Sequence, residues 1–394
     1  MAGLHIGWRS FVVTLLLVTA ATRAAAEPAC TFDQMQANPA SVIGPCSQAL
    51  DAGQLADAAK AQDFYVRGRA YARTGQTALA AQDLDVAVKL APNRSDVLVS
   101  RANAESKLGH SDEAWGDLQR ALTLNPKEAR AWFAIGQFYR DSGDVDQALA
   151  AFGSALAANP AEPYSLLERS NLLAFRHRLA EAMVDATALV DIPPIVINKL
   201  GYVDGRGVMT DFHVIALNHR ASLYEQTGDQ VASDRDLEGA IAEQPSASTY
   251  RQRAESLLRR GRPEQALKDA DEAVRLDSTD GDAQYLRGLT FANLKRFAEG
   301  LDALDKAIAA HGRVVVSREQ VGMDYLMRAR MLRGLGKTDD AVAAVTKAVA
   351  ISPEVKGYTV AAMQARGYWN DNQAPYGATF QASLRACMID EDCN

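Results

Sequence analysis

The chain has 394 residues, 48% of them hydrophobic, and carries a formal net charge of −7. This length is sufficient for a large buried core. The acidic balance gives no global reason to expect nucleic-acid binding, because that affinity comes mainly from cations that neutralise phosphates. We therefore expect no nucleic-acid partner.

Residues 1–26 have the pattern of a cleavable signal peptide. Arg9 precedes a mostly apolar run from Phe11 to Thr22, and small residues allow cleavage after Ala26. The run is too short to cross a bilayer, which takes ~20 helical residues. Two alternatives are a retained anchor and lipid attachment at Cys30, although Glu27 stands where a lipidation motif has an apolar residue. We expect a periplasmic or secreted protein with no stable membrane span after signal removal.

The four cysteines form two local pairs, Cys30 with Cys46 and Cys387 with Cys393. In an oxidising compartment we expect each pair to close as a disulfide. The alternative is a zinc site, but the cysteines lack CxxC spacing and nearby histidines.

The dominant feature of the chain is a pattern that recurs every 34 residues. Each unit has a small residue at positions 8 and 20, and every unit except the degenerate fourth, which has Leu189, has alanine at position 27. Eight units begin at Ala61, Ser95, Ala129, Pro163, Val214, Ala247, Gly281 and Gly322. Insertions interrupt the pattern at 195–213 and at about 311–321, and Ser233 replaces Ala at position 20 of the fifth unit.

The pattern predicts pairs of antiparallel helices. Small residues let the two helices approach, and large residues at positions 4, 11 and 24 fill the space between them. Glycine at position 15 ends the first helix in a left-handed cap, and the residues concerned are Gly75, Gly109, Gly143, Gly228, Gly261 and Gly336. Proline at position 32 stops the second helix in most units. Each pair exposes an apolar face that its neighbours bury.

These residues resemble the tetratricopeptide-repeat family over about 61–353. The resemblance implies an all-α fold, a right-handed superhelical solenoid of antiparallel helix pairs. Repeats 1–4 then cover 61–194 and repeats 5–8 cover 214–353, and we expect the solenoid to bend or hinge at the 195–213 insertion.

Both ends are expected to cap the solenoid. Residues 27–60 form a partial repeat, with a helix over 42–55 onto which Cys30–Cys46 pins a strand-like tail. The tail, 354–394, begins with a helix at about 354–366. Residues 357–388 are similar to small peptidoglycan-binding-like modules, in Gly367-Tyr368-Trp369, Tyr376-Gly377 and a helix through Thr379, Ala382 and Leu384. Ala374-Pro375 replaces the usual Asp-Gly there. The alternative is a solvating helix with a disulfide-tied end.

No catalytic constellation is present in the sequence. The six histidines are scattered, without HExxH, and there is no GxSxG, P-loop or Rossmann glycine pattern. His213 and His219 fall on different faces of one helix. We expect no enzyme activity, no cofactor and no metal.

In the tetratricopeptide family, positions 2, 5, 9, 12 and 13 of the first helix line a concave groove. The resemblance assigns to a peptide-binding groove Tyr65, Arg69, Arg73, Asn103, Lys107, Arg130, Phe133, Gln137, Arg140, Tyr164 and Asn171. These basic and amide groups suit carboxylates and an extended peptide backbone. The family's clamp for a terminal carboxylate is not intact, because Tyr65, Val99 and Phe133 replace its Lys at position 5. The alternative is an ordinary solvated face.

A second series recurs at position 7, comprising Arg67, Arg101, Arg169, Arg220, Arg253, Arg287 and Arg328. We expect these arginines to be structural, with packed stems and heads that pair with acids of adjacent helices.

The leading hypothesis is therefore an exported scaffold that holds a protein or peptide in the groove of its first four repeats. The second is a cell-envelope adaptor that contacts peptidoglycan through the C-terminal tail. The third, an enzyme, requires an unrecognised site in the 195–213 insertion. Because a fold does not determine a function, the resemblance supports the fold far more than the partner.

Overall fold

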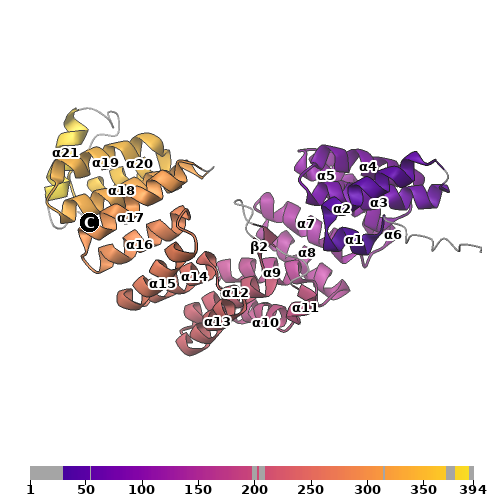
Figure 1. Ribbon diagram of the computed structural model, residues 1–394, viewed down its shortest axis with the longest axis horizontal. Helices are drawn as coiled ribbons and strands as arrows, with labels where there is room; N and C mark the ends of the chain where they lie inside the picture. Colours follow the sequence, from indigo (N-terminus) through magenta and orange to yellow (C-terminus); the bar gives the residue numbers. More distant parts are fainter. Residues whose placement is uncertain are drawn as a thin grey trace, which may run out of the picture. The chain divides into compact units, whose positions relative to one another are not determined.

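The computed structural model describes residues 30–53, 55–197, 202–203, 209–313, 316–369 and 378–389. Almost all of them lie in helices (Figure 1). The chain divides into two compact units, one up to Ala134 and the other from Ile135 onward. The boundary falls inside helix α7 (Ala129–Asp141).

The N-terminal unit stacks helix pairs in chain order. Its helices are α1 (Phe32–Ala37), α2 (Pro39–Asp51), α3 (Asp57–Arg73), α4 (Thr77–Leu90), α5 (Ser95–Lys107) and α6 (Ser111–Leu124). Helices α3 and α4 form the first pair and α5 and α6 the second, while α4 packs on α5 and α2 packs on α3.

The second unit has the same internal arrangement of helix pairs. Its helices are α8 (Val145–Ala158), α9 (Pro163–Phe175), α10 (Leu179–Val190), α11 (Pro194–Ile197), α12 (Phe212–Thr227), α13 (Gln230–Glu243), α14 (Ala247–Arg259), α15 (Pro263–Leu276), α16 (Gly281–Asn293), α17 (Phe297–His311), α18 (Arg318–Gly334), α19 (Thr338–Ile351), α20 (Pro353–Ala365) and α21 (Ala378–Ile389). Each first helix packs on its own second helix, and each second helix packs on the next pair. The predicted fold class, an all-α solenoid of helix pairs, is confirmed.

Close approach of the paired helices explains the small residue at position 8. A Cβ atom added to Gly68 would lie 2.9 Å from Leu84, and one added to Gly288 would lie 2.7 Å from Leu304. Leu84 and Leu304 both stand at position 24 of their repeats. A side chain at position 8 would therefore push the two helices apart.

The turn at position 15 is left-handed, as predicted. All six glycines at this position have positive φ, between 66° for Gly261 and 86° for Gly109. Repeats 4 and 7 have His177 and Lys295 in the same place, and these two residues also adopt positive φ, 58° and 56°. The turn geometry is thus kept where the sequence lacks glycine.

The long insertion does not break the stack. Helices α10 and α12, which flank it, pack directly on each other, and Leu189 and Phe212 share one core cluster. The insertion itself contains α11 and a short antiparallel pair, β1 (Tyr202–Val203) with β2 (Met209–Thr210). Because Phe212 and His213 are buried residues of α12, the insertion is shorter than the sequence pattern predicts.

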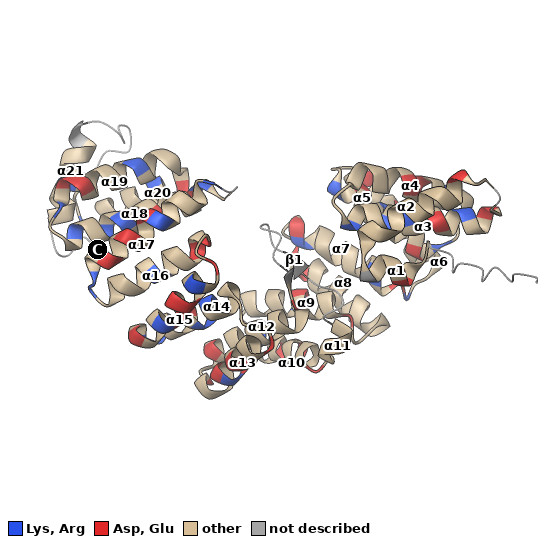
Figure 2. Cartoon of the chain, viewed as in Figure 1, with Lys and Arg blue, Asp and Glu red and all other residues tan. Residues whose placement is uncertain are grey.

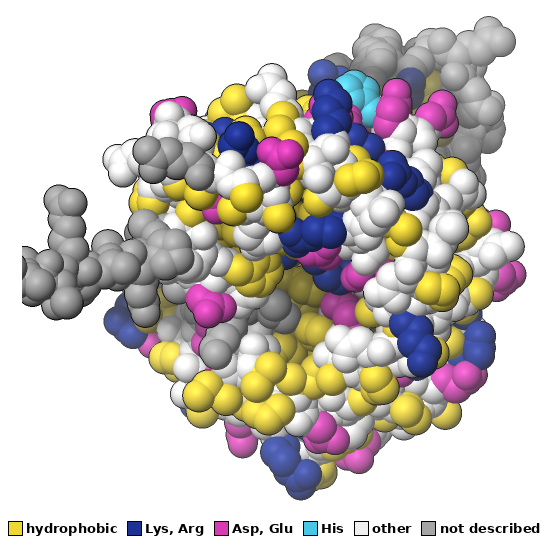
Figure 3. All heavy atoms as spheres, turned by 90° about the vertical axis from the view of Figure 1, so that its right-hand side faces the viewer, with side chains coloured by type: hydrophobic (Ala, Val, Ile, Leu, Met, Phe, Trp, Pro, Cys, Tyr) yellow, Lys and Arg dark blue, Asp and Glu magenta, His cyan; other side chains and the backbone are white. Residues whose placement is uncertain are grey.

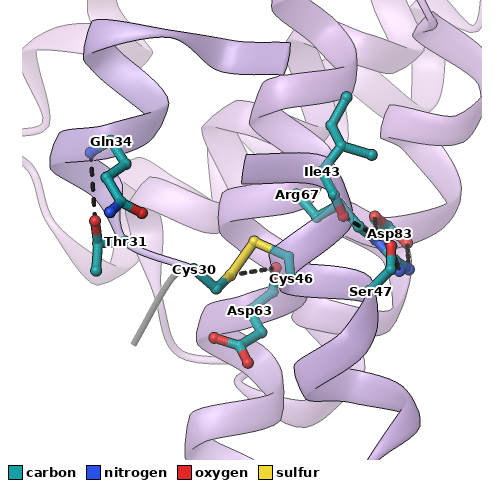
Figure 4. The surroundings of a disulfide bond; sticks show 9 residues. All are labelled: Cys30, Thr31, Gln34, Ile43, Cys46, Ser47, Asp63, Arg67 and Asp83. Carbon is teal, nitrogen blue, oxygen red and sulfur yellow. Dashed lines mark hydrogen bonds and ion pairs between the residues drawn. A yellow bond between two sulfur atoms is a disulfide. The ribbon is translucent and has the colours of Figure 1, made fainter. Parts of the chain in front are cut away.

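The N-terminal cap differs from its prediction. The expected strand-like tail contains α1, which Thr31 caps by accepting a hydrogen bond from the Gln34 amide, and α2 starts earlier than expected because Pro39 occupies its first turn. Cys30 and Cys46 are joined by a disulfide (Figure 4). Ser47 of α2 accepts a 2.8 Å hydrogen bond from Arg67 of α3.

The C-terminal tail packs against the last repeat. Trp369 and Phe380 meet edge to face, with ring centroids 5.4 Å apart, and both belong to a core cluster with Val345 of α19. Cys387 is disulfide-bonded, while its expected partner Cys393 lies outside the described residues, as does the Tyr376-Gly377 motif. Peptidoglycan binding by this tail stays a prediction. In the part of the chain that the structure describes, no helix is long and apolar enough to cross a membrane.

Candidate binding groove

Acidic and basic residues are spread over the helices of both units (Figure 2). Most position-7 arginines bind an aspartate of their own repeat. Each donates from Nε and one terminal nitrogen to both oxygens of the aspartate sixteen residues later, at 2.6–2.8 Å. The pairs are Arg67–Asp83, Arg101–Asp117, Arg169–Asp185, Arg220–Asp236 and Arg253–Asp269. These arginines join the two helices of a repeat, as expected of structural residues.

Repeats 7 and 8 depart from this pattern. The residue sixteen positions after Arg287 is Ala303, and the residue sixteen after Arg328 is Ala344. Arg287 binds Asp271 instead, and Arg328 binds Asp305. Both aspartates lie on the second helix of the preceding repeat, so these arginines join successive repeats.

The groove cations of the N-terminal unit are bonded differently. Within the described residues, none of four predicted groove cations forms an ion pair with a carboxylate. They are Arg69, Arg73, Lys107 and Arg130. The charge of Arg130 acts on Asp96 without an ion pair, and the Asp96 carboxylate binds Arg94 at 2.6 Å.

Neutral groups take the place of carboxylates around these cations. Arg69 donates to the hydroxyl of Tyr65 at 3.2 Å, and Arg130 donates to the hydroxyl of Ser100 at 3.1 Å. Burial, followed by the positive charge of Arg130, lowers the pKa of Arg69. Two neighbouring cations that form no ion pair within the described residues favour the approach of an anionic group.

The N-terminal cap covers part of the predicted groove. Phe32 of α1 stacks on Tyr65, with ring centroids 6.3 Å apart, and also lies 4.8 Å from the guanidinium carbon of Arg69. The carbonyl of Gln36 accepts a hydrogen bond from Arg73. Tyr65 is only 3% exposed. The Tyr65 ring thus packs against the cap, and its assignment to a ligand-binding groove stays a prediction.

Beyond the cap, three polar residues of the predicted groove are accessible in the N-terminal unit. Asn103 and Lys107 of α5 are exposed, and Arg130 of α7 is half-buried, as is the neighbouring Phe133. Figure 3 shows one face of the molecule, on which several Lys and Arg side chains gather among hydrophobic ones. Exposed amide and cationic side chains on first helices are suited to a peptide that carries carboxylates.

The remaining predicted groove residues belong to the second unit. Arg140 binds both Asp141 and Glu168 at 2.8 Å, so its charge is already balanced. Tyr164 packs edge-on against Phe212 at 4.9 Å within the core. Gln137 is half-buried and Asn171 is exposed. Arg140 and Tyr164 thus have partners within the unit, and ligand binding by these two residues stays a prediction.

A buried polar network in repeats 6 to 8 was not predicted. His311 binds Asp324 at 2.7 Å and Asp282 at 3.2 Å, and Asp282 also binds Arg251 at 2.6 Å. Hydrogen bonds to Asp282 and Asp324 raise the pKa of His311 to about 9. His311 stands where the sequence predicts an insertion, so no periodic signal places it in the core.

His219 and Ser170 form a second buried polar contact. The two side chains lie 2.7 Å apart, and the Ser170 hydroxyl donates to the carbonyl of Ala182 at 2.7 Å. Burial lowers the pKa of His219 to about 4. Because Ser170 is fully buried, this pair joins α9 to α12 and is closed to a substrate. Among the described residues, no cluster of His, Cys, Asp and Glu could hold a metal ion.

Stacked helix pairs with polar first-helix faces define a helical-repeat scaffold, and a comparison with known proteins specifies the kind of repeat. A family model described as a tetratricopeptide repeat matches residues 99–163, 137–191 and 251–313. The chain therefore contains tetratricopeptide repeats, as the sequence pattern predicts.

Three similar proteins each match part of this chain. Human tetratricopeptide repeat protein 6 is 33% identical over 96 residues, which cover 24% of this chain and 18% of that protein. The DnaJ homolog subfamily C member 7 homolog of Schizosaccharomyces pombe is 24% identical over 296 residues, or 68% of this chain and 57% of that protein. A tetratricopeptide repeat protein from Parabacteroides merdae, whose crystal structure is known, has 17% sequence identity with this chain. The superposition has a TM-score of 0.49 and covers 69% of this chain and 99% of that protein's chain.

Proposed function

We propose that this chain is a non-catalytic scaffold whose N-terminal unit binds an acidic, extended segment of a protein partner. The support is a contrast between two sets of cations. Position-7 arginines such as Arg67 and Arg101 bind aspartates, whereas Lys107 and Arg130 make no ion pair within the described residues. Cations left without carboxylates in a chain of net charge −7 are suited to carboxylates that come from another molecule.

The neighbouring groups favour a peptide over a small anion. Asn103 stands one turn before Lys107 on α5, and its exposed amide can both donate to and accept from a peptide backbone. Phe133, which is half-buried, lies one turn after Arg130 on α7 and leaves part of its apolar side chain exposed. Alternating polar and apolar contacts of this kind suit a segment with acidic and apolar side chains.

The proposal is tested by fluorescence anisotropy with a short labelled peptide rich in Asp, Glu and Leu. We expect binding that weakens as salt is raised, because the contacts are between charges on the surface. The double variant Lys107→Glu and Arg130→Glu is expected to lose at least about tenfold in affinity, which corresponds to ~1.4 kcal/mol.

The matched control for this experiment is Lys127→Glu, which reverses an exposed charge of the same unit in the loop before α7. It is expected to bind the acidic peptide like the wild type. Equal losses in the control and the double variant, or no binding by the wild type at low salt, would refute the groove as the binding surface. Unchanged helicity by circular dichroism would show that each variant is folded.

We further propose that the protein is exported and works in the periplasm or outside the cell. The signal-like pattern of residues 1–26 and the disulfide between Cys30 and Cys46 support this location. Cell fractionation with N-terminal sequencing tests it. Export predicts a chain that begins at Glu27 in the non-cytoplasmic fraction, and an uncleaved chain with reduced cysteines in the cytoplasm would contradict it.

A further inference from the structure

A pocket between repeats 7 and 8 is not used by the peptide-binding proposal. It has a volume of about 490 Å³ and lies among α17, α18 and α19 of the second unit. The side chains that determine its chemistry are Asp305, Tyr325, Arg328, Asp340, Ala344 and Lys347. Ile308 and Ala343 add apolar wall.

The pocket lies where an aspartate is missing. In five repeats the residue sixteen positions after the position-7 arginine is an aspartate that accepts two hydrogen bonds from it, as Asp269 does from Arg253. In repeat 8 this residue is Ala344. Arg328 donates only through Nε, to Asp305 at 2.6 Å, and its terminal nitrogens have no protein partner within the described residues.

A second cation faces the same space. The Nζ atom of Lys347 lies 4.6 Å from the ring centre of Tyr325 and forms no ion pair within the part of the chain that the structure describes. Its counterpart in repeat 7, Lys306, binds Asp302 at 2.6 Å. The hydrogen-bonding capacity of Arg328 and Lys347 is therefore incompletely used, and both residues line one pocket.

The acids of the pocket limit the kind of anion that fits. Asp305 and Asp340 offset the two cations, so the lining has no net charge and does not attract a polyanion from a distance. An anion that enters the pocket can still bind directly to the guanidinium of Arg328 and the ammonium group of Lys347. This combination suits a single carboxylate, and the apolar wall suits a short aliphatic chain attached to it.

We propose that this pocket binds one carboxylate group, seated where an aspartate at position 344 would place its own, between the terminal nitrogens of Arg328 and Nζ of Lys347. The ligand is a short monocarboxylic acid, either free or as the acidic side chain of a peptide. Because the pocket is lined by repeats 7 and 8, none of its residues belongs to the groove of the N-terminal unit.

Saturation-transfer difference NMR on the full chain tests the proposal, because this method detects weak ligands of a large protein. The probes are sodium propionate and acetyl-Ala-Asp-Ala-amide, each compared with sodium chloride at equal ionic strength. We expect saturable transfer to at least one probe with the wild type. Tighter binding of propionate identifies a free acid as the ligand, and tighter binding of the peptide identifies an acidic side chain.

Two variants and one control locate the binding. Ala344→Asp supplies the missing carboxylate from within, so it is expected to weaken probe binding at least about tenfold. Lys347→Gln removes one of the two cations and is expected to weaken binding as well. Lys306→Gln removes the equivalent lysine of repeat 7 and is expected to have no effect. Binding unchanged in both Ala344→Asp and Lys347→Gln, or absent from the wild type for both probes, would overturn the proposal.

Discussion

Arg253 and Asp269 form a two-point ion pair between the paired helices α14 and α15. Nε and Nη2 of the arginine each donate to a different carboxylate oxygen at 2.7 Å. The aspartate side chain is only 9% exposed, so its charge depends on the arginine for compensation. The same relationship recurs in four other repeats, which makes it a regular part of this solenoid.

Replacing Asp269 with Ala is expected to lower the free energy of unfolding by about 2–3 kcal/mol, because the substitution leaves a partly buried guanidinium without its partner. Urea denaturation followed by circular dichroism measures the change. The control is Asp271→Ala, which removes the 49% exposed partner of Arg287 and is expected to cost less than about 1 kcal/mol. Equal losses in the two variants would contradict a structural role specific to the buried pair.

Glycine is expected to stabilise the two turns that lack it. His177 and Lys295 hold positive φ of 58° and 56°, a conformation that costs a side-chain-bearing residue about 1–2 kcal/mol. After the entropic cost of glycine, each of His177→Gly and Lys295→Gly should raise the stability by about 0.5–1 kcal/mol. Thermal unfolding measures the gain. Gly143→Ala, at the same turn position of repeat 3, should lower the melting temperature, and a rise there would contradict the reason given.

The contribution of His311 to stability is expected to decline in alkaline solution. Its pKa is about 9 in the folded protein, above the ordinary value of 6.5, so the folded state binds the proton more tightly. The resulting stabilisation is complete below pH 6.5 and is lost as the pH rises towards 9. The difference in melting temperature between wild type and His311→Gln should therefore shrink over this range. A constant difference would contradict a charged His311 between Asp282 and Asp324.

His219 is expected to have the opposite effect. Its pKa falls to about 4 because of burial, so the unfolded chain takes up a proton at a higher pH than the folded chain does. Stability is then lost as the pH falls from 6.5 towards 4. Melting temperatures across this range, compared with those of His219→Gln, measure the effect. If the variant is as acid-sensitive as the wild type, protonation of His219 is not the cause.

The sequence predicts the features of the structure that recur from repeat to repeat, and it does not predict those that occur once. The helix pairs, the turn glycines and the position-7 arginines each recur at a fixed position of the 34-residue unit. Each further repeat therefore adds support to the predicted role of that position. Helix α1 has only six residues and no second copy, so neither its helical form nor the contact of Phe32 with Tyr65 could be read from the pattern.

Ion pairs between residues of different repeats could not be predicted from the sequence either. Arg140 was assigned to the groove by its register, but Glu168 on the next first helix balances its charge. His311 was assigned to an insertion, although it binds Asp282 and Asp324 from two other helices. The position of a residue within its repeat predicts the helix face on which it lies. It does not predict the ion-pair partner, because that depends on which neighbouring repeats have an Asp or Glu close enough to form the pair.

The most direct test of the central claim, that Lys107 and Arg130 bind an acidic segment, is a charge exchange. Anisotropy is measured for an acidic peptide and its Lys-substituted counterpart, with the wild type and with the Lys107→Glu, Arg130→Glu double variant. The claim predicts that the wild type prefers the acidic peptide and that the double variant prefers the basic one. The same preference in both proteins, with helicity unchanged, would show that the partner binds elsewhere.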